Sequence, residues 1–344
     1  PWPGRIVRLM SASVTVLSGP AGCGKTARLL SDYRARLAAS PLGSCVWIAP
    51  NRDAARLVRR RLLDREGSAR LAPGVVTFGQ LADRILQRAP VSSLAPFGQR
   101  LALRRIIDSA ARDGLRYFAP VAETTALVDL AAEFIAELKR REIRADEFNE
   151  QLQQSGASGR YCDLARIYGR YEKFLADHRV YDAEGRFWEA RKRLRAGDRG
   201  GLTMLRYVVV DGFTDFTASQ HEILALLGGG LEEIRFGLTM DDADSTAVDG
   251  DDASRRPSRS ELFSKPRETL LRLKEHHATV RVESLVSAAD TDSGFARIRH
   301  ELFADDAAIR GDRPPVRDGR VEILAAATPR HELELIARRI KQLL

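Results

Sequence analysis

VTVLSGPAGCGKTARLL, residues 14–30, joins an apolar run, a glycine-rich turn and a second apolar pattern without interruption. The apolar residues before the turn predict a buried strand, and the apolar spacing after it predicts a helix. Gly19, Gly22 and Gly24 leave the turn almost free of side chains, so that successive backbone N–H groups can wrap a chain of phosphates. Residues 19–26 follow the P-loop spacing G-x-x-x-x-G-K-T in the strand-then-helix context which that motif requires. The sequence therefore predicts a nucleotide site here.

The polar residues of this loop have separate predicted tasks. The Lys25 ammonium is expected to reach the β- and γ-phosphates, and the Thr26 hydroxyl is expected to bind Mg²⁺. The N-terminus of the following helix carries a partial positive charge that favours the same anion. The predicted cofactors are ATP and Mg²⁺.

A P-loop also needs a carboxylate at the end of a neighbouring strand to hold the shell of the metal. YVVVD, residues 207–211, supplies an apolar strand that ends on Asp211. In enzymes that hydrolyse the nucleotide, the next residue is usually a glutamate that orients the attacking water, whereas Gly212 stands here. Asp215 is a candidate substitute base, although no pattern in the sequence assigns it that task. The sequence thus favours ATP binding over ATP hydrolysis and leaves the catalytic residue open.

Composition limits the partners and the compartment. The 344 residues suffice for about two domains, each with its own core. Lysine and arginine number 55 against 47 aspartates and glutamates, a net charge of +8 that favours a polyanion such as DNA or RNA as partner. The three cysteines are scattered, with no CxxC pair, which is typical of a reducing cytoplasm and indicates no metal site. No segment of the sequence is long and apolar enough to span a membrane.

Repeated strand–helix units predict a parallel sheet with flanking helices. CVWIAPN, residues 45–51, reads as a short strand, and an arginine-rich helix follows it as far as residue 63. VVTF, residues 75–78, reads as the next strand. In the arginine-rich helix, the residues expected to face the core are Ala55, Leu57, Val58, Leu62 and Leu63.

Residues 93–199 do not continue the strand–helix pattern. They contain four amphipathic helical patterns and no credible strand. Strand patterns return at residues 205–213 and 232–240, and a polar stretch that reads as a solvated loop follows at 241–260. Helix and strand patterns after that loop indicate a further α/β unit. We therefore predict an α/β fold in three parts: a P-loop domain of residues 1–92 and 200–240, a helical insertion of residues 93–199, and a linker with the start of a second α/β domain at 241–344.

Several segments together resemble a known group of proteins. They are GPAGCGKT, WIAPNRDAARLVRRRL, VVTFGQLADRIL, VVVDGFTDFTASQHEIL and AAATPRHELELIARRI, which follow one another in the order of the N-terminal motifs of superfamily 1 helicases of the UvrD/RecB type. The similarity is closer to the AddB-type subunit of bacterial helicase–nucleases, which has DGF where helicases have DE. It covers essentially the whole chain and implies a RecA-like P-loop domain, with residues 93–199 as the insertion called 1B.

The resemblance also implies roles for single residues. Phosphate contacts fall to Gly24, Lys25 and Thr26, a Mg²⁺ role falls to Asp211, and contacts with DNA fall to Asn51 and Thr77. Two departures from active helicases are Gly212 and Thr214, which stand where helicases have the catalytic Glu and a Gln that senses the γ-phosphate. The helicase pattern GDxxQSIY is also missing downstream.

The expected function is therefore an ATP-binding, DNA-binding module of a helicase–nuclease for recombinational repair of double-strand breaks, with weak or no motor activity. Expected partners are single-stranded DNA or duplex ends and a second subunit of the AddA type. Three alternatives stay open: an active superfamily 1 helicase that uses Asp215 or another base, a small-molecule P-loop kinase, and a scaffold whose nucleotide site only stabilises the fold. ATP turnover stimulated by single-stranded DNA would support the active helicase, no turnover would support the binding module, and turnover stimulated by a metabolite would support the kinase.

Members of this family commonly carry a PD-(D/E)XK nuclease domain with iron–sulfur cysteines near the C-terminus, and nothing in this sequence corresponds to it. Glu137, Leu138 and Lys139 imitate the nuclease pattern ExK, with Asp129 upstream. They fall on one amphipathic helix, whereas the nuclease places them on strands, so we interpret them as surface charges. A nuclease domain is expected only beyond residue 344.

Overall fold

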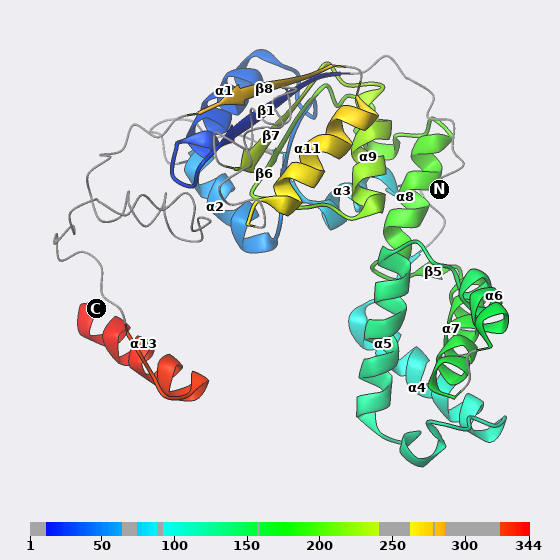
Figure 1. The fold of residues 1–344 in the computed structure, drawn as a ribbon. Helices are drawn as coiled ribbons and strands as arrows, with labels where there is room; N and C mark the ends of the chain where they lie inside the picture. The colour runs from blue at the N-terminus through cyan, green and yellow to red at the C-terminus, as the bar shows by residue number, and fades with distance from the viewer. Residues whose placement is uncertain are drawn as a thin grey trace, which may run out of the picture.

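The computed structural model describes residues 12–63, 74–87, 92–156, 159–240, 262–277, 279–285 and 324–344. It contains an α/β body and a helical insertion that extends from it (Figure 1). None of the described helices is long and apolar enough to cross a bilayer.

A six-stranded parallel sheet forms the centre of the α/β body. Its strands are β1 (Ser13–Gly19), β2 (Cys45–Ala49), β3 (Val75–Thr77), β6 (Tyr207–Asp211), β7 (Glu233–Thr239) and β8 (Val280–Ser284), in the order β3-β2-β6-β7-β1-β8. Because all strands are parallel, their carboxyl ends lie along one edge, where ligands of open α/β sheets usually bind. The predicted parallel α/β fold is confirmed.

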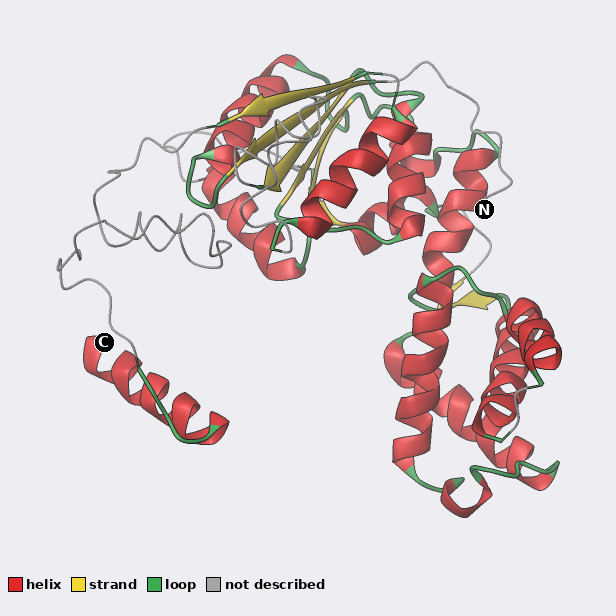
Figure 2. Ribbon diagram, viewed as in Figure 1, coloured by secondary structure: helices red, strands yellow, loops and turns green. Residues whose placement is uncertain are grey.

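Helices cover both faces of this sheet (Figure 2). α1 (Lys25–Ala39) and α2 (Arg52–Leu63) pack on one face, around the fully buried Trp47. The other face is covered by α3 (Phe78–Ile85), α8 (Gly185–Arg195), α9 (Ala218–Gly228) and α11 (Ser264–His276). Two short 3-10 helices lie at Ala119–Val121 and Gly200–Leu202.

The predictions for α2 and β3 need correction. Ala55, Val58 and Leu62 are buried as expected, but Leu57 is 49% exposed and Leu63 is 50% exposed. Only residues spaced three or four positions apart on one side of a helix can face a sheet. Leu57 and Leu63 lie outside the stripe that Ala55, Val58 and Leu62 form. Phe78 begins α3 instead of ending the strand, because Thr77 and Gln80 form a capping box there.

The helical insertion has its own core. Its helices are α4 (Pro96–Arg112), α5 (Thr125–Arg140), α6 (Ala145–Ser155) and α7 (Arg160–Asp177), packed around Tyr168 and Tyr171. At its base, β4 (Ser92–Ser93) and β5 (Val180–Tyr181) form a small parallel pair that the sequence did not predict. Two-residue strands leave no periodic pattern to detect. α8 lies inside the predicted insertion but packs in the core of the α/β body, against α3 and α9.

β8 belongs to the six-stranded sheet, contrary to the prediction. The sequence pattern assigned the helix and strand after residue 240 to a second domain, whereas β8 pairs with β1 and α11 packs against α9. α11 and β8 therefore belong to the same α/β body as the P-loop. The expected loop at 241–260 and most of the segment before the final helix lie outside the described residues. That helix, α13 (Pro329–Leu343), forms as expected.

Candidate nucleotide site

The glycines of the predicted P-loop shape the turn between β1 and α1. Gly22 and Gly24 have φ angles of 83° and 95°, which residues with side chains rarely adopt. A Cβ atom at either position would meet nothing within 4 Å, so the loop surface there is open. Gly19 differs, since its Cβ atom would lie 2.4 Å from the carbonyl oxygen of Leu285, just after β8. The loop thus combines an open concave side with a tightly packed base.

Lys25 is held in the middle of this loop. Its side chain is buried, and Nζ donates hydrogen bonds of 2.7 Å to the carbonyl oxygens of Gly19 and Pro20. Cys23 Sγ lies 3.6 Å from the same nitrogen. No carboxylate pairs with Lys25 in the part of the chain that the structure describes. A buried ammonium without a counter-ion is costly, so an anion bound in the loop would be strongly favoured.

Thr26 and Asp211 meet at the carboxyl edge of the sheet although 185 positions separate them in the sequence. The Thr26 hydroxyl donates a 2.8 Å hydrogen bond to Asp211 Oδ2. Burial raises the pKa of the Asp211 carboxyl, while the hydrogen bonds from Thr26 and from the Gly212 N–H oppose that rise. A hydroxyl beside a carboxylate offers the hard oxygen atoms that Mg²⁺ prefers.

Gly237 contributes to this site although it was not among the residues predicted from the sequence. It lies on β7 opposite Asp211, and a Cβ atom there would come within 2.3 Å of Asp211 Oδ1. The absence of a side chain therefore leaves room for the carboxylate. The signal was a glycine inside the strand pattern EIRFGLT, which often marks a close approach.

The loop after β6 is held by contacts with Pro50 and with α11. Gly212 has a φ of 85°, and its Cβ atom would lie 3.3 Å from Cδ of Pro50. Asp215, the candidate base, is half-exposed and forms an ion pair of 3.1 Å with Lys265 of α11. The Thr214 hydroxyl lies 3.3 Å from Asp215 Oδ1. The Asp215 carboxylate is thus engaged by α11.

Asn51 and Thr77 lie at the carboxyl ends of β2 and β3, on the same edge as the P-loop. Asn51 Oδ1 accepts a 2.8 Å hydrogen bond from the N–H of Ala54 in the first turn of α2. Thr77 Oγ1 accepts from the N–H of Gln80, whose side chain accepts from the Thr77 N–H in return. Both residues therefore cap helices, and a contact with DNA stays a prediction.

Known proteins resemble this chain over most of its length. A family model described as ADDB, N-terminal, matches residues 16–301. The chain belongs to this family. It is 30% identical to the B-type subunit of the ATP-dependent helicase/deoxyribonuclease of Moorella thermoacetica, over 96% of its own length and 29% of that protein. The protein of the same name from Bacillus subtilis is 24% identical over 95% of this chain and 28% of its own. The chain thus spans less than a third of these relatives.

Membership in the ADDB N-terminal family confirms the resemblance drawn from the sequence motifs, and it does not favour the small-molecule kinase. One interpretation within the insertion was wrong. Lys139 is not a surface charge, because it is 2% exposed and forms a 2.9 Å ion pair with the equally buried Asp182. Glu137 and Asp129 are partly exposed and paired with arginines, as expected of surface charges.

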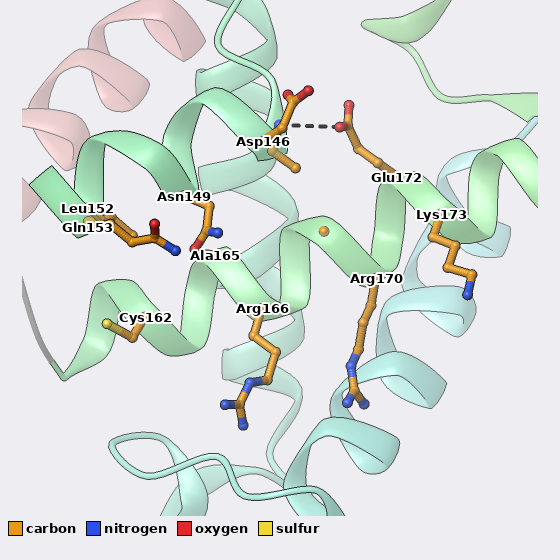
Figure 3. A pocket seen from close by; sticks show the side chains of 12 residues that line it. Asp146, Asn149, Leu152, Gln153, Cys162, Ala165, Arg166, Arg170, Glu172 and Lys173 are labelled. Carbon is orange, nitrogen blue, oxygen red and sulfur yellow. Dashed lines mark hydrogen bonds between the residues drawn. The ribbon is translucent and has the colours of Figure 1, made fainter.

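A groove of about 760 Å³ lies far from the P-loop, between α6 and α7 (Figure 3). Figure 3 shows Arg166 and Arg170 extending from α7 away from α6. There Arg166 donates to the carbonyl oxygen of Gly114, and Arg170 pairs with Asp113 at 2.7 Å. These two arginines hold α7 against the end of α4 and are not free to bind phosphates in the groove. The groove is therefore a weaker candidate for a nucleotide site than the P-loop.

Proposed function

We propose that this chain is the nucleotide- and DNA-binding N-terminal module of a bacterial helicase–nuclease subunit that acts in recombinational repair of double-strand breaks. The observation that carries the proposal is the meeting of Lys25, Thr26 and Asp211 around an open glycine loop. The relatives are named as one subunit of an ATP-dependent helicase/deoxyribonuclease, which supports the assignment to such an enzyme. Their name also supports a partner subunit, which we infer to be of the AddA type, and a cytoplasmic location.

The nucleotide would be ATP with Mg²⁺. The backbone N–H groups of residues 22–26 and the Lys25 ammonium would bind the phosphates. Thr26 and Asp211 would hold Mg²⁺, which when bound neutralises charge on the phosphate oxygens. No cluster of three His, Cys, Asp or Glu suited to a metal occurs among the described residues. A metal in this site would therefore depend on the phosphates for much of its coordination.

Hydrolysis is expected to be slow. Gly212 contributes no carboxylate next to Asp211, and the Asp215 carboxylate faces Lys265 of α11. A group that orients and deprotonates the attacking water typically raises the rate of hydrolysis by about 10²–10⁴-fold, and the chain lacks this contribution. An active helicase that uses Asp215 is the second candidate. It requires the ion pair with Lys265 to open, and it predicts rapid ATP turnover in the presence of single-stranded DNA.

Binding of DNA would rest on exposed arginines. Arg52 and Arg60 on α2 and Arg105 on α4 have no ion pair within the described part of the chain, whereas Arg56 on α2 pairs with Asp53. Unpaired guanidinium groups are available for phosphates. The net charge of +8 supports the same conclusion.

The nucleotide proposal is tested by titrating the purified chain with ATP and Mg²⁺ in a calorimeter. Replacing Lys25 with alanine removes a charge-assisted contact of about 1.5–3 kcal/mol, so affinity should fall roughly 10- to 150-fold. Lys173→Ala, an exposed lysine in the groove between α6 and α7, is the matched control and should bind as the unchanged chain does. Equal affinity of the Lys25→Ala variant would show that the loop is not the nucleotide site.

A further inference from the structure

Charged side chains fasten the helical insertion to the α/β body. The two parts have separate apolar cores, and polar contacts join them at the end of α5. Lys139 of α5 pairs with Asp182, which lies shortly before α8, and its ammonium lies 5.5 Å from the ring centre of Trp188 in α8. The end of α5 is therefore attached to the α/β body by directional contacts.

Glu142 extends this junction to α9. Its carboxylate accepts a 3.0 Å hydrogen bond from the Ser219 hydroxyl in the first turn of α9. Arg191 of α8 pairs with the same Glu142 oxygen and, at 3.2 Å, with Glu222 of α9. Glu142 thus links the insertion directly to α9 and, through Arg191, to α8.

The backbone of Glu142 is unusual as well. Its φ of 63° lies in the left-handed region, which residues other than glycine seldom adopt. This conformation ends α5, because the N–H groups of Glu142 and Ile143 donate to the carbonyl oxygens of Lys139 and Leu138, the pair of hydrogen bonds that commonly closes a helix C-terminus. From this turn the Glu142 carboxylate contacts α8 and α9.

α9 is in turn linked closely to the nucleotide site. Only residues 212–217 separate Asp211 from α9, and Phe213 and Phe216 stack within this loop at 4.9 Å. Phe78 of α3 packs edge-on against both rings, and Thr217 caps α9. These packed side chains connect the end of β6 to α9 by direct contact.

We propose that Glu142 couples occupancy of the nucleotide site to the orientation of the helical insertion. The coupling rests on the proposed function, since it needs ATP and Mg²⁺ to bind beside Thr26 and Asp211. Charge that arrives there favours one position of α9, and the contact between Ser219 and Glu142 transmits that preference to the end of α5. Glu142 acts as a positioning residue and does not itself contact the nucleotide.

Hydrogen–deuterium exchange, read by mass spectrometry with and without saturating ATP and Mg²⁺, tests this coupling. The amides of residues 141–143 are suitable reporters, because each is hydrogen-bonded to a carbonyl oxygen of α5. In the unchanged chain, nucleotide should alter their exchange rates several-fold. Glu142→Gly removes the carboxylate and suits the left-handed backbone, so it should abolish that response while leaving nucleotide affinity within about twofold. Glu142→Gln, which keeps the size of the side chain, should weaken the response.

Glu137→Gln is the matched control, because Glu137 lies on the same helix and pairs only with Arg140 and Arg141 in the described structure. It should respond to nucleotide as the unchanged chain does. The coupling is refuted if nucleotide binds but leaves exchange at residues 141–143 unchanged, or if Glu142→Gly retains the full response. Calorimetry on the same samples separates this outcome from failure of the proposed function, in which no nucleotide binds at all.

Discussion

The positive φ angle of Gly212 restricts which residues can replace it. An alanine at φ 85° occupies the left-handed region and brings its Cβ within 3.3 Å of Pro50. Gly212→Ala should therefore lower the free energy of unfolding by about 1–2 kcal/mol, measured by urea denaturation. Gly169→Ala is a control of opposite sign, since Gly169 lies inside α7 with nothing within 4 Å of its Cβ position. It should raise stability by roughly 0.5–1 kcal/mol.

The same angle decides what Gly212→Glu can do. A glutamate placed at this position would inherit the left-handed backbone and a contact with Pro50, so we expect its carboxylate to be poorly placed to orient the attacking water. We expect ATP turnover of Gly212→Glu to equal that of the unchanged chain, with or without single-stranded DNA. A clear gain of turnover would show that the backbone of this loop adapts, and that only the carboxylate was missing.

At the scale of elements, the packing of α9 against α11 depends on two neutral histidines. Burial lowers the pKa of His221 to about 4, with help from Arg272, and burial with help from His276 lowers the pKa of His277 to about 4. In the unfolded chain both rings protonate near pH 6.5. The unfolded state therefore binds more protons between about pH 6.5 and 4, and the free energy of unfolding should fall as the pH drops through this window, by up to about 3 kcal/mol per histidine.

Thermal unfolding at a series of pH values checks this prediction. His221→Gln and His277→Gln should each flatten the decline in melting temperature between pH 6.5 and 4.5. His178→Gln serves as control, because His178 lies exposed at the end of α7. An unchanged slope in both buried variants would mean that other groups cause the loss of stability in acid.

At the scale of the whole molecule, the positive charge predicts how DNA affinity depends on salt. Each neutralised phosphate releases counter-ions, so the logarithm of affinity for single-stranded DNA should fall with the logarithm of salt concentration by about 0.7 per contact. Arg60→Ala should reduce this slope by about one contact, whereas Arg56→Ala should reduce it less because Asp53 already pairs with Arg56. Fluorescence anisotropy measures both. An affinity for DNA that does not change with salt concentration, or no binding at low salt, would contradict an interface based on phosphate contacts.

The strand, glycine-rich loop and helix of the P-loop motif, and the class of fold, could be predicted from the sequence alone. The P-loop motif lies within eight consecutive residues, and its strand and helix are equally local, so pattern and spacing suffice to place them. The long amphipathic helices of the insertion were also predictable, because their apolar period repeats over several turns. Asp211 could be assigned to a strand end for the same local reason.

Which distant residues meet became apparent only in the folded chain. β8 lies beside β1, and Thr26 contacts Asp211 across 185 positions, because the order of strands in a sheet depends on long-range packing that no short window encodes. The burial of Lys139 depends on Asp182, a partner 43 positions away that a helical pattern does not reveal. The contacts of the Glu142 carboxylate with Ser219 and Arg191 likewise have no sequence signal, since these residues lie 77 and 49 positions away and meet it only once the chain has folded.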